Sequence, residues 1–144
     1  MTITFHTEYA FRIIIFLLLR PNEIIPTREI AERYGISTNH LNKVSQTLVT
    51  NGILTSTRGK GGGIQLVEAS KTLKIGTLMK SLEPKTETAQ CSGGGGLSAC
   101  VISPVCGLRG MLGGAQDAFW QYLDQYTVED LIKKNGPQML SLLS

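Results

Sequence analysis

Apolar residues follow the 3.6-residue period of a helix in several separate stretches of this chain, with short β-branched runs between them. In residues 8–19 they cover nearly the whole circumference of the expected helix, which predicts burial on more than one side. Thr7 is expected to cap this helix and Pro21 to stop it. Residues 1–5 are expected to be extended. The apolar run at residues 13–19 is shorter than the ~20 residues that span a bilayer, so we interpret it as part of a buried helix.

Two shorter helices are predicted at residues 27–34 and 38–50, with a glycine between them. Ser37 is expected to cap the second helix, and Gly52 to end it in the left-handed conformation that glycine adopts easily. The second helix turns a polar face outward, and its inner stripe has the spacing i, i+3, i+4, i+7: Leu41, Val44, Ser45 and Leu48. A helix, a short turn and a polar-faced helix form the helix-turn-helix pattern, here at about residues 27–51.

A β-hairpin wing is predicted at residues 53–67, with strands at 53–57 and 64–67 and the turn RGKGGG between them. The tip presents Arg58 and Lys60 with little side-chain bulk around them, which suits a phosphate backbone or a narrow minor groove. A plain surface hairpin is the alternative. The turn lacks the GK[ST] ending of a nucleotide-binding loop and no helix follows it directly, so nucleotide binding is not expected.

The second half of the chain is predicted to hold a short helix at residues 75–82 and a long one at residues 105–126. The long helix carries a continuous apolar stripe, as expected where two helices pack along their length: Leu108, Leu112, Ala115, Phe119 and Leu123. Thr127 is expected to cap a last helix at residues 128–134. Gly136-Pro137 is expected to end that helix ahead of a short apolar tail.

Charge is distributed unevenly along the 144 residues. Residues 1–80 contain ten Lys and Arg against five Asp and Glu, whereas residues 81–144 contain four against six. The positive excess coincides with the helix-turn-helix and the wing, which favours contact with nucleic acid. We find no signal peptide, so a cytoplasmic, reducing environment is expected.

All three cysteines lie in the segment CSGGGGLSACVISPVC, at residues 91–106. Three cysteines cannot all form disulfides with one another, and in a reducing environment clustered cysteines are more often metal ligands or redox thiols. Structural zinc sites usually use closely spaced C-x₂₋₄-C pairs, whereas the gaps here are wide. Wide gaps suit a larger thiolate-bound group such as an iron–sulfur cluster, whose fourth ligand would come from elsewhere. A thiol switch without a cluster stays open.

These features predict a mainly α fold with a small β-wing, in which a winged helix-turn-helix is joined to a long C-terminal dimerisation helix. We expect a DNA-binding domain at residues 1–84, a cysteine loop at 85–106, and the dimerisation helix with its tail at 107–144. An enzyme is not expected, because we find no Ser/His/Asp set and no acids paired at catalytic spacing. A small iron–sulfur electron carrier is an alternative of another class, which the helix-turn-helix and basic wing disfavour.

The stretches TREIAERYGISTNHLNKVSQTLVTNGIL, STRGKGGGIQL and LEP, followed by three cysteines and a long helix, resemble the iron–sulfur winged-helix transcriptional regulators of the IscR/NsrR family. The resemblance covers about residues 1–135. It implies a homodimer in which each winged domain reads one half of a palindromic operator. The residues that would face the DNA are Arg28, Ser37, Thr38, Asn39, His40, Lys43, Arg58 and Lys60.

Within that family the chain resembles the NsrR type. Arg109 stands where IscR-like members have a ligating histidine, and Thr7-Glu8-Tyr9 is similar to a T-D-Y motif whose acid reaches the cluster of the other subunit. By spacing alone Glu8 would only complement the helix dipole. The segment 119–131 is also NsrR-like, whereas the first cysteine gap is longer than usual and the acid is Glu instead of Asp.

The resemblance implies one [2Fe–2S] or [4Fe–4S] cluster per subunit, and its ligands would be Cys91, Cys100, Cys106 and, in trans, Glu8. It further implies a repressor of nitrosative-stress genes that responds to nitric oxide. Iron supply, oxygen or redox state are the alternative signals.

Overall fold

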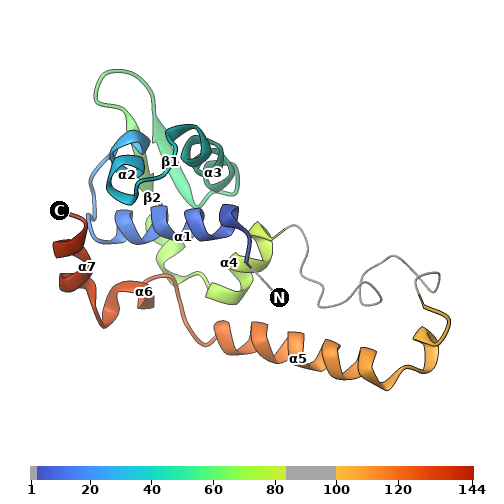
Figure 1. Cartoon of the computed structure of the whole chain (residues 1–144). Coiled ribbons are helices and arrows are strands. Elements are labelled where there is room, and N and C mark those ends of the chain that lie inside the picture. Colours follow the sequence, from blue (N-terminus) through green and yellow to red (C-terminus); the bar gives the residue numbers. More distant parts are fainter. Residues whose placement is uncertain (1–2, 84–99) are drawn as a thin grey trace. The chain divides into compact units, whose positions relative to one another are not determined.

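The computed structural model describes residues 3–83 and 100–144, and Figure 1 shows their elements in chain order. The chain divides into two compact units. The first, here called the wing unit, comprises Thr4–Leu73 and Thr127–Ser144. The second, here called the α5 unit, comprises Met1–Ile3 and Lys74–Tyr126. No helix in the described ranges is both long and apolar enough to cross a membrane.

Helix α1, Phe5–Leu18, is buried nearly all round, as its sequence predicted. Its start was predicted wrongly, because Thr4 and not Thr7 is the N-cap, and the Thr4 side chain accepts a hydrogen bond from the Thr7 N–H at 3.4 Å. Phe5 is therefore helical instead of extended, and Thr7 is fully buried inside the first turn. The helix ends close to the predicted position, with Leu19 at its C-cap.

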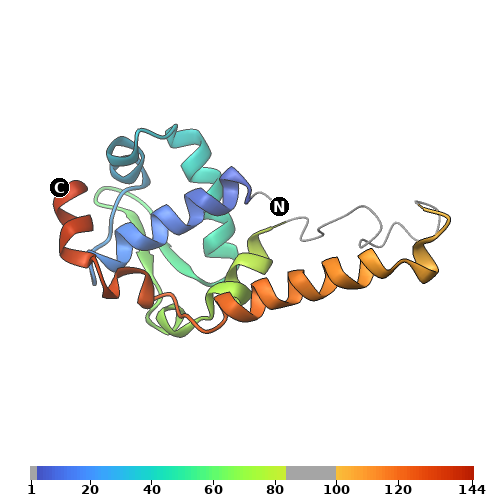
Figure 2. The same cartoon turned by 60° about the horizontal axis from the view of Figure 1, so that its bottom comes forward.

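Helices α2, Thr27–Tyr34, and α3, Thr38–Thr50, have the predicted bounds and lie together against α1 (Figure 2). Gly35 ends α2 at φ 63°, and Gly52 follows α3 at φ 71°, both in the left-handed region that glycine accommodates. Ser37 occupies the N-cap position of α3, but its side chain makes no capping hydrogen bond. The inner stripe of α3 is buried as predicted: Leu41, Val44, Ser45 and Leu48.

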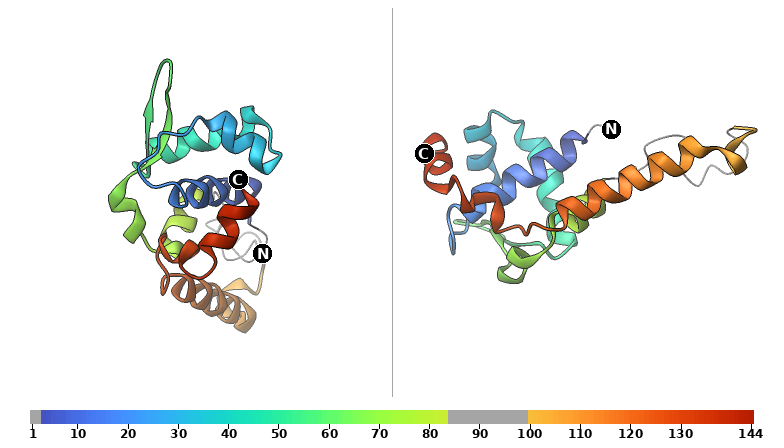
Figure 3. Two further views of the ribbon diagram at one scale, coloured as in Figure 1. Left: turned by 90° about the vertical axis from the view of Figure 1, so that its left-hand side faces the viewer. Right: turned by 90° about the horizontal axis from the view of Figure 1, so that it is seen from below.

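The wing is an antiparallel hairpin of β1, Leu54–Thr57, and β2, Gly63–Leu66. The hairpin projects beyond the helices of its unit (Figure 3, left). Each strand differs by one residue at one or both ends from its predicted range. Ile25 and Ile64 exchange backbone hydrogen bonds at 3.0 and 2.9 Å, which ties the loop before α2 to the wing. A Cβ at position 63 would collide with the Ile25 carbonyl, so this close approach requires a glycine.

The C-terminal part of the wing unit is more helical than predicted. After the 3₁₀ turn η1, Glu68–Thr72, the unit resumes with α6, Asp130–Lys133, and α7, Gly136–Leu142. The predicted apolar tail is therefore wrong, because Gly-Pro begins a helix here: proline fits the first helical turn, where its missing N–H costs nothing. The end of α7 contacts the end of α1, where an Arg20 guanidinium N–H donates to the Leu143 carbonyl at 3.5 Å.

The α5 unit pairs α4, Ile75–Leu82, which has the predicted bounds, with the long helix α5, Gly107–Leu123. Helix α5 is shorter than the predicted range 105–126. At its start the 3₁₀ turn η3, Ser103–Val105, leads into an extended Cys106. At its end Asp124 turns back and accepts a hydrogen bond from the Thr77 N–H at 2.7 Å, which caps the first turn of α4. The buried side chain of Trp120 anchors α5 against α4.

Helix α6 is shorter than the predicted range 128–134, and its N-cap position is Glu129 and not the predicted Thr127. Its first residue, Asp130, instead binds back to Thr127. Its carboxylate accepts hydrogen bonds from the Thr127 N–H and the Thr127 hydroxyl, each at 2.9 Å, and from the Lys133 ammonium at 3.1 Å. These bonds, led by the one from the Thr127 backbone, lower the pKa of Asp130 to about 2. A carboxyl whose pKa is lower in the folded state stabilises the fold above its unfolded pKa of roughly 3.9.

We therefore predict that Asp130→Asn lowers the free energy of unfolding at neutral pH, and that its difference from the natural chain shrinks as pH falls from about 4 to about 2. Urea unfolding at a series of pH values measures this. The matched control is Asp117→Asn on an exposed part of α5, which should leave stability nearly unchanged. A difference that stays constant down to pH 2 would contradict this role of Asp130.

Candidate DNA-binding surface and metal centre

The first turns of α3 present polar side chains opposite its buried stripe. Ser37, Asn39, His40 and Lys43 are exposed and Thr38 is half-buried. Because the buried stripe holds α3 against the rest of its unit, these side chains are presented from a rigid helix. Such a polar-faced second helix is what a helix-turn-helix inserts into a major groove.

The wing tip carries the other two predicted cations, Arg58 and Lys60, both exposed. The glycines around them are needed for the turn itself: Gly59 and Gly61 have φ of 96° and 81°, and a Cβ at Gly62 would collide with the backbone of the strand. The turn closes through a 2.9 Å hydrogen bond from the Gly62 N–H to the Gly59 carbonyl. Exposed cations on a narrow hairpin without neighbouring bulk can follow a phosphate backbone.

Arg28, on α2, has a competing partner. Its guanidinium donates to the Glu32 carboxylate at 2.7 Å, and the two side chains are 79% and 62% exposed. An exposed ion pair of this kind contributes little to stability and exchanges easily with solvent or another anion. The ion pair is therefore compatible with the predicted DNA contact, which would replace Glu32 by a phosphate.

The described part of the cysteine segment places two cysteines on either side of one short turn. Cys100 is exposed and Cys106 is half-buried, and both are free. The Ser103 N–H donates to the Cys100 carbonyl at 3.1 Å, and Cys106 is the N-cap of α5. A helix N-terminus favours negative charge, which suits a thiolate ligand. Cys91 lies outside the described residues.

Arg109, at the position of the histidine in IscR-like sequences, contacts the turn before α5. It donates from Nη1 to the Ser103 hydroxyl at 3.3 Å, and Ser103 is only 5% exposed. A guanidinium is always charged and has no lone pair for a metal, so Arg109 cannot ligate iron. It holds the turn between Cys100 and Cys106 in place. Sequence reasoning missed Ser103, because no motif marks a buried serine in a turn.

Glu8 lies in the first turn of α1, with its side chain 42% exposed and its carboxylate 3.6 Å from the Arg12 guanidinium. Arg12 also lies 5.4 Å from the centre of the Tyr9 ring. On α2, burial raises the pKa of Tyr34, and the positive charge of Arg12 partly opposes this shift. Arg12 thus contacts both Glu8 and Tyr9 within α1.

These side chains have the donor chemistry of an iron–sulfur site: thiols, whose thiolates are the usual ligands of such clusters, and one carboxylate. Within residues 3–83 and 100–144, no three His, Cys, Asp or Glu side chains gather into a metal site. Cys100 and Cys106 belong to the α5 unit, whereas Glu8 belongs to the wing unit. Their meeting at one centre therefore stays a prediction.

Helix α5 and the turn before it expose many apolar side chains. Leu108 is 61% and Met111 73% exposed, and Val101 and Val105 exceed 85%. Of the predicted stripe, Ala115 is also exposed and the remaining members are half-buried. Large apolar side chains exposed in such number favour an interaction site.

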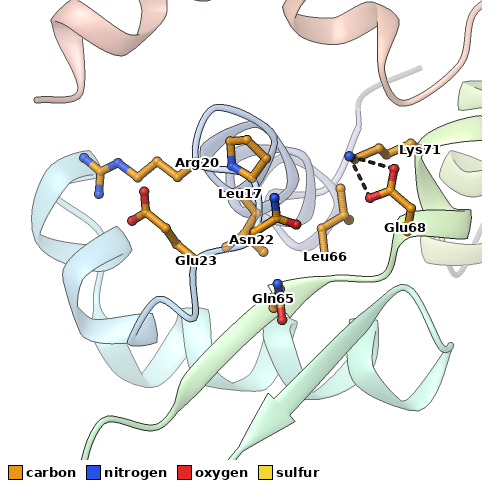
Figure 4. A pocket seen from close by; sticks show the side chains of 9 residues that line it. Leu17, Arg20, Asn22, Glu23, Gln65, Leu66, Glu68 and Lys71 are labelled. Carbon is orange, nitrogen blue, oxygen red and sulfur yellow. Dashed lines mark hydrogen bonds and ion pairs between the residues drawn. The ribbon is translucent and has the colours of Figure 1, made fainter.

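A small hollow near the end of α1 does not resemble a substrate site (Figure 4). It encloses only about 20 Å³, roughly the space of one water molecule. Three of its four charged residues form ion pairs, since Lys71 pairs with Glu68 at 2.8 Å within η1 and Arg20 pairs with Glu29 of α2. The fourth is Glu23.

The model of the Rrf2 family, described as iron-dependent transcriptional regulators, matches residues 3–134. The chain belongs to the Rrf2 family. It is 40% identical over 144 residues to the HTH-type transcriptional regulator NsrR of Bacillus subtilis, covering 99% of this chain and 97% of that protein. It is 37% identical over 145 residues to the NsrR of Bacillus licheniformis, covering the whole of both chains.

Solved structures agree with this membership. The global cysteine regulator CymR of B. subtilis has a TM-score of 0.71 at 22% identity, covering 92% of this chain and 97% of that one. IscR of T. potens has a TM-score of 0.71 at 19% identity, covering 92% and 87%. These identities show the fold alone, and the predicted winged-helix fold class is confirmed. The Rrf2 relatives are DNA-binding transcriptional regulators and not enzymes, as the sequence predicted for this chain.

We predict that Arg58→Ala and Lys60→Ala each weaken binding to duplex DNA of any sequence. Each lost phosphate contact should reduce the slope of log affinity against log salt concentration by about one. Fluorescence anisotropy with a labelled non-cognate duplex at several salt concentrations measures the slope. Lys134→Ala, at an exposed position outside α3 and the wing, is the matched control and should keep the natural slope. Wing variants with an unchanged slope would rule out phosphate contacts at the tip.

Proposed function

We propose that this Rrf2 protein is a homodimeric, iron–sulfur-dependent repressor that releases its operator in response to nitric oxide. The observation that carries the proposal is the pair of free thiols, Cys100 and Cys106, held by one short turn at the start of a long helix with exposed apolar surface. The iron dependence of the family supports a metal at these thiols. The nitric-oxide signal rests on the resemblance to NsrR-type sequences, which the full-length identity to NsrR proteins supports.

The proposed ligands are the thiolates of Cys91, Cys100 and Cys106 from one subunit and the carboxylate of Glu8 from the other. Thiolates are the usual ligands of [2Fe–2S] and [4Fe–4S] clusters. One such cluster per subunit would supply iron atoms that react with nitric oxide. Arg109 supports the site by fixing the turn between two of the ligands through Ser103.

The exposed apolar side chains of α5 support dimerisation. Leu108 and Met111 would cost free energy if left in water, roughly 25 cal/mol for each Å² of apolar surface. Pairing of α5 with the same helix of a second subunit would remove that surface from water. A twofold axis between the subunits would place the wing and α3 of each subunit on one half of a palindromic operator. The same predicted DNA-facing residues of each subunit would then contact its own half-site.

Glu8 provides the proposed switch. A carboxylate is a harder and weaker ligand for iron than a thiolate, so Glu8 should leave the centre before the cysteines do. Once released, Glu8 would interact fully with Arg12, which already lies 3.6 Å away. Glu8 lies on α1, which packs against α3, so a shift of α1 would reach the helix-turn-helix. DNA affinity would then depend on whether Glu8 is bound to iron.

A second candidate keeps the DNA function and changes the signal. The family description is of iron-dependent regulators, so iron supply or redox state could load and unload the same thiols. The ligand residues and the DNA-contacting residues would be the same under both signals.

We predict that Glu8→Ala keeps much of the cluster but uncouples it from the operator. Iron and sulfide content should fall only in part. The visible circular dichroism should change, because one iron ligand is lost. Operator affinity should change less when nitric oxide is added. The operator is a duplex that the natural protein selects from random sequence. These quantities are measured on anaerobically purified protein.

The matched control is Glu68→Ala, which removes another carboxylate paired with a cation, Lys71, at 2.8 Å. This variant should keep the natural spectrum and the natural response. If Glu8→Ala also kept the natural spectrum and the natural response to nitric oxide, Glu8 would have no part in the switch.

A further inference from the structure

A cavity of about 280 Å³ opens in the wing unit between the first turns of α1 and α3, which lie beside each other in Figure 2. Its walls come from one face of each helix, at the spacings i, i+1, i+4 on α1 and i, i+3, i+4 on α3. The lining residues are Phe5, His6, Tyr9, His40, Lys43 and Val44. Sequence reasoning did not predict this cavity, because α1 and α3 are far apart in the chain.

One wall of the cavity is aromatic. The rings of Phe5 and Tyr9 have centroids 6.0 Å apart and planes inclined by 31°, so they present neighbouring faces on α1. Phe5 is 73% exposed although it is large and apolar. Val44 is nearly buried and provides an apolar floor. A flat ring placed here would cover apolar surface that is otherwise in contact with water.

The other polar side chains that line the cavity are basic. Lys43 contributes a positive charge, and His6 and His40 contribute imidazoles that can donate hydrogen bonds. No acidic residue lines the cavity, and across the described ranges Lys43 has no ion-pair partner. An ammonium group beside an aromatic wall, in a concave site without a carboxylate, favours an anion over a cation.

We propose that this cavity binds a small aromatic carboxylate, with its ring against Phe5 and Tyr9 and its carboxylate at Lys43. The size is sufficient for one ring and one acidic group, because a cavity of about 150 Å³ already holds benzene. A phosphate group would satisfy Lys43 but would leave the aromatic wall uncovered. The combination of ring and charge therefore distinguishes this ligand class from a simple anion.

Binding at this cavity would also affect DNA. His40 and Lys43 belong to the DNA-contacting face under the function proposed above, so the ligand and the operator would compete for them. By linkage, the ligand would weaken operator binding and the operator would weaken ligand binding by the same factor. This consequence rests on the proposed function, whereas ligand binding itself does not.

The experiment titrates the full-length protein with benzoate in the absence of DNA and follows backbone amide shifts by NMR. Three further probes separate the contribution of the ring from that of the negative charge. Benzamide has the ring without the charge, and acetate has the charge without the ring. Inorganic phosphate represents a phosphate of the DNA backbone. Benzoate should bind at least tenfold more tightly than each of them, with the largest shifts at the start of α1 and in α3.

The variants Lys43→Met and Phe5→Ala should each weaken benzoate binding about tenfold. Lys134→Met and Leu142→Ala are matched controls, because both side chains are exposed and lie outside the cavity, and they should bind benzoate normally. Circular dichroism checks that all four variants are folded. No benzoate binding at 10 mM, equal binding of benzamide or phosphate, or undiminished binding by both cavity variants would each overturn the site.

Operator binding is then measured with and without benzoate. Weaker operator binding at saturating benzoate supports the competition. If benzoate binds at the cavity and operator affinity does not change, the ligand site stands and the competition with DNA is overturned.

Discussion

The packing of α1 is the interaction on which the wing unit depends. Ile13, Ile14 and Phe16 are at most 1% exposed, and α1 contacts α3, β2 and α6. Each such side chain contributes roughly 1.5–3 kcal/mol when it is fully buried. Because one helix supports the recognition helix, the wing and the C-terminal helices together, a displacement of α1 would move all of them. Glu8 lies at its first turn, where a ligand bond could act on this support.

The wing unit and the α5 unit expose different kinds of side chain. In the wing unit the side chains of Lys43, Arg58 and Lys60 are exposed and form no ion pair with a described acidic residue. Their positive charges are therefore available to neutralise DNA phosphates. In the α5 unit several large apolar side chains are exposed, including Leu108 and Met111, as on a surface that pairs with another subunit. The sequence predicted the cations of the wing unit, whereas of the apolar stripe predicted on α5 only Leu108 and Ala115 are exposed.

Much of the fold was predictable because local patterns decide it: α2, α3 and α4 have the predicted bounds. The predicted helix boundaries are wrong where two alternative starting or ending points have similar local stability. Thr4 and Thr7 are both good caps, and burial of Thr7 decides between them; Gly-Pro can end a helix or begin one, as it does in α7. The cavity between α1 and α3 was not predictable, because it depends on which faces meet in three dimensions. The proposed metal centre would combine ligands from separate segments and subunits. The cysteine spacing suggested a cluster, and only the resemblance suggested Glu8 as its fourth ligand.

The central claim is that an iron–sulfur centre controls DNA binding, and one titration tests it most directly. The protein is purified without oxygen, its iron and sulfide are counted per chain, and nitric oxide is added while visible absorption and operator binding are followed on the same sample. The account predicts a coloured protein whose spectrum and operator affinity decline together at low nitric oxide. A colourless protein that binds its operator, or a coloured protein whose operator affinity is indifferent to nitric oxide, would contradict it.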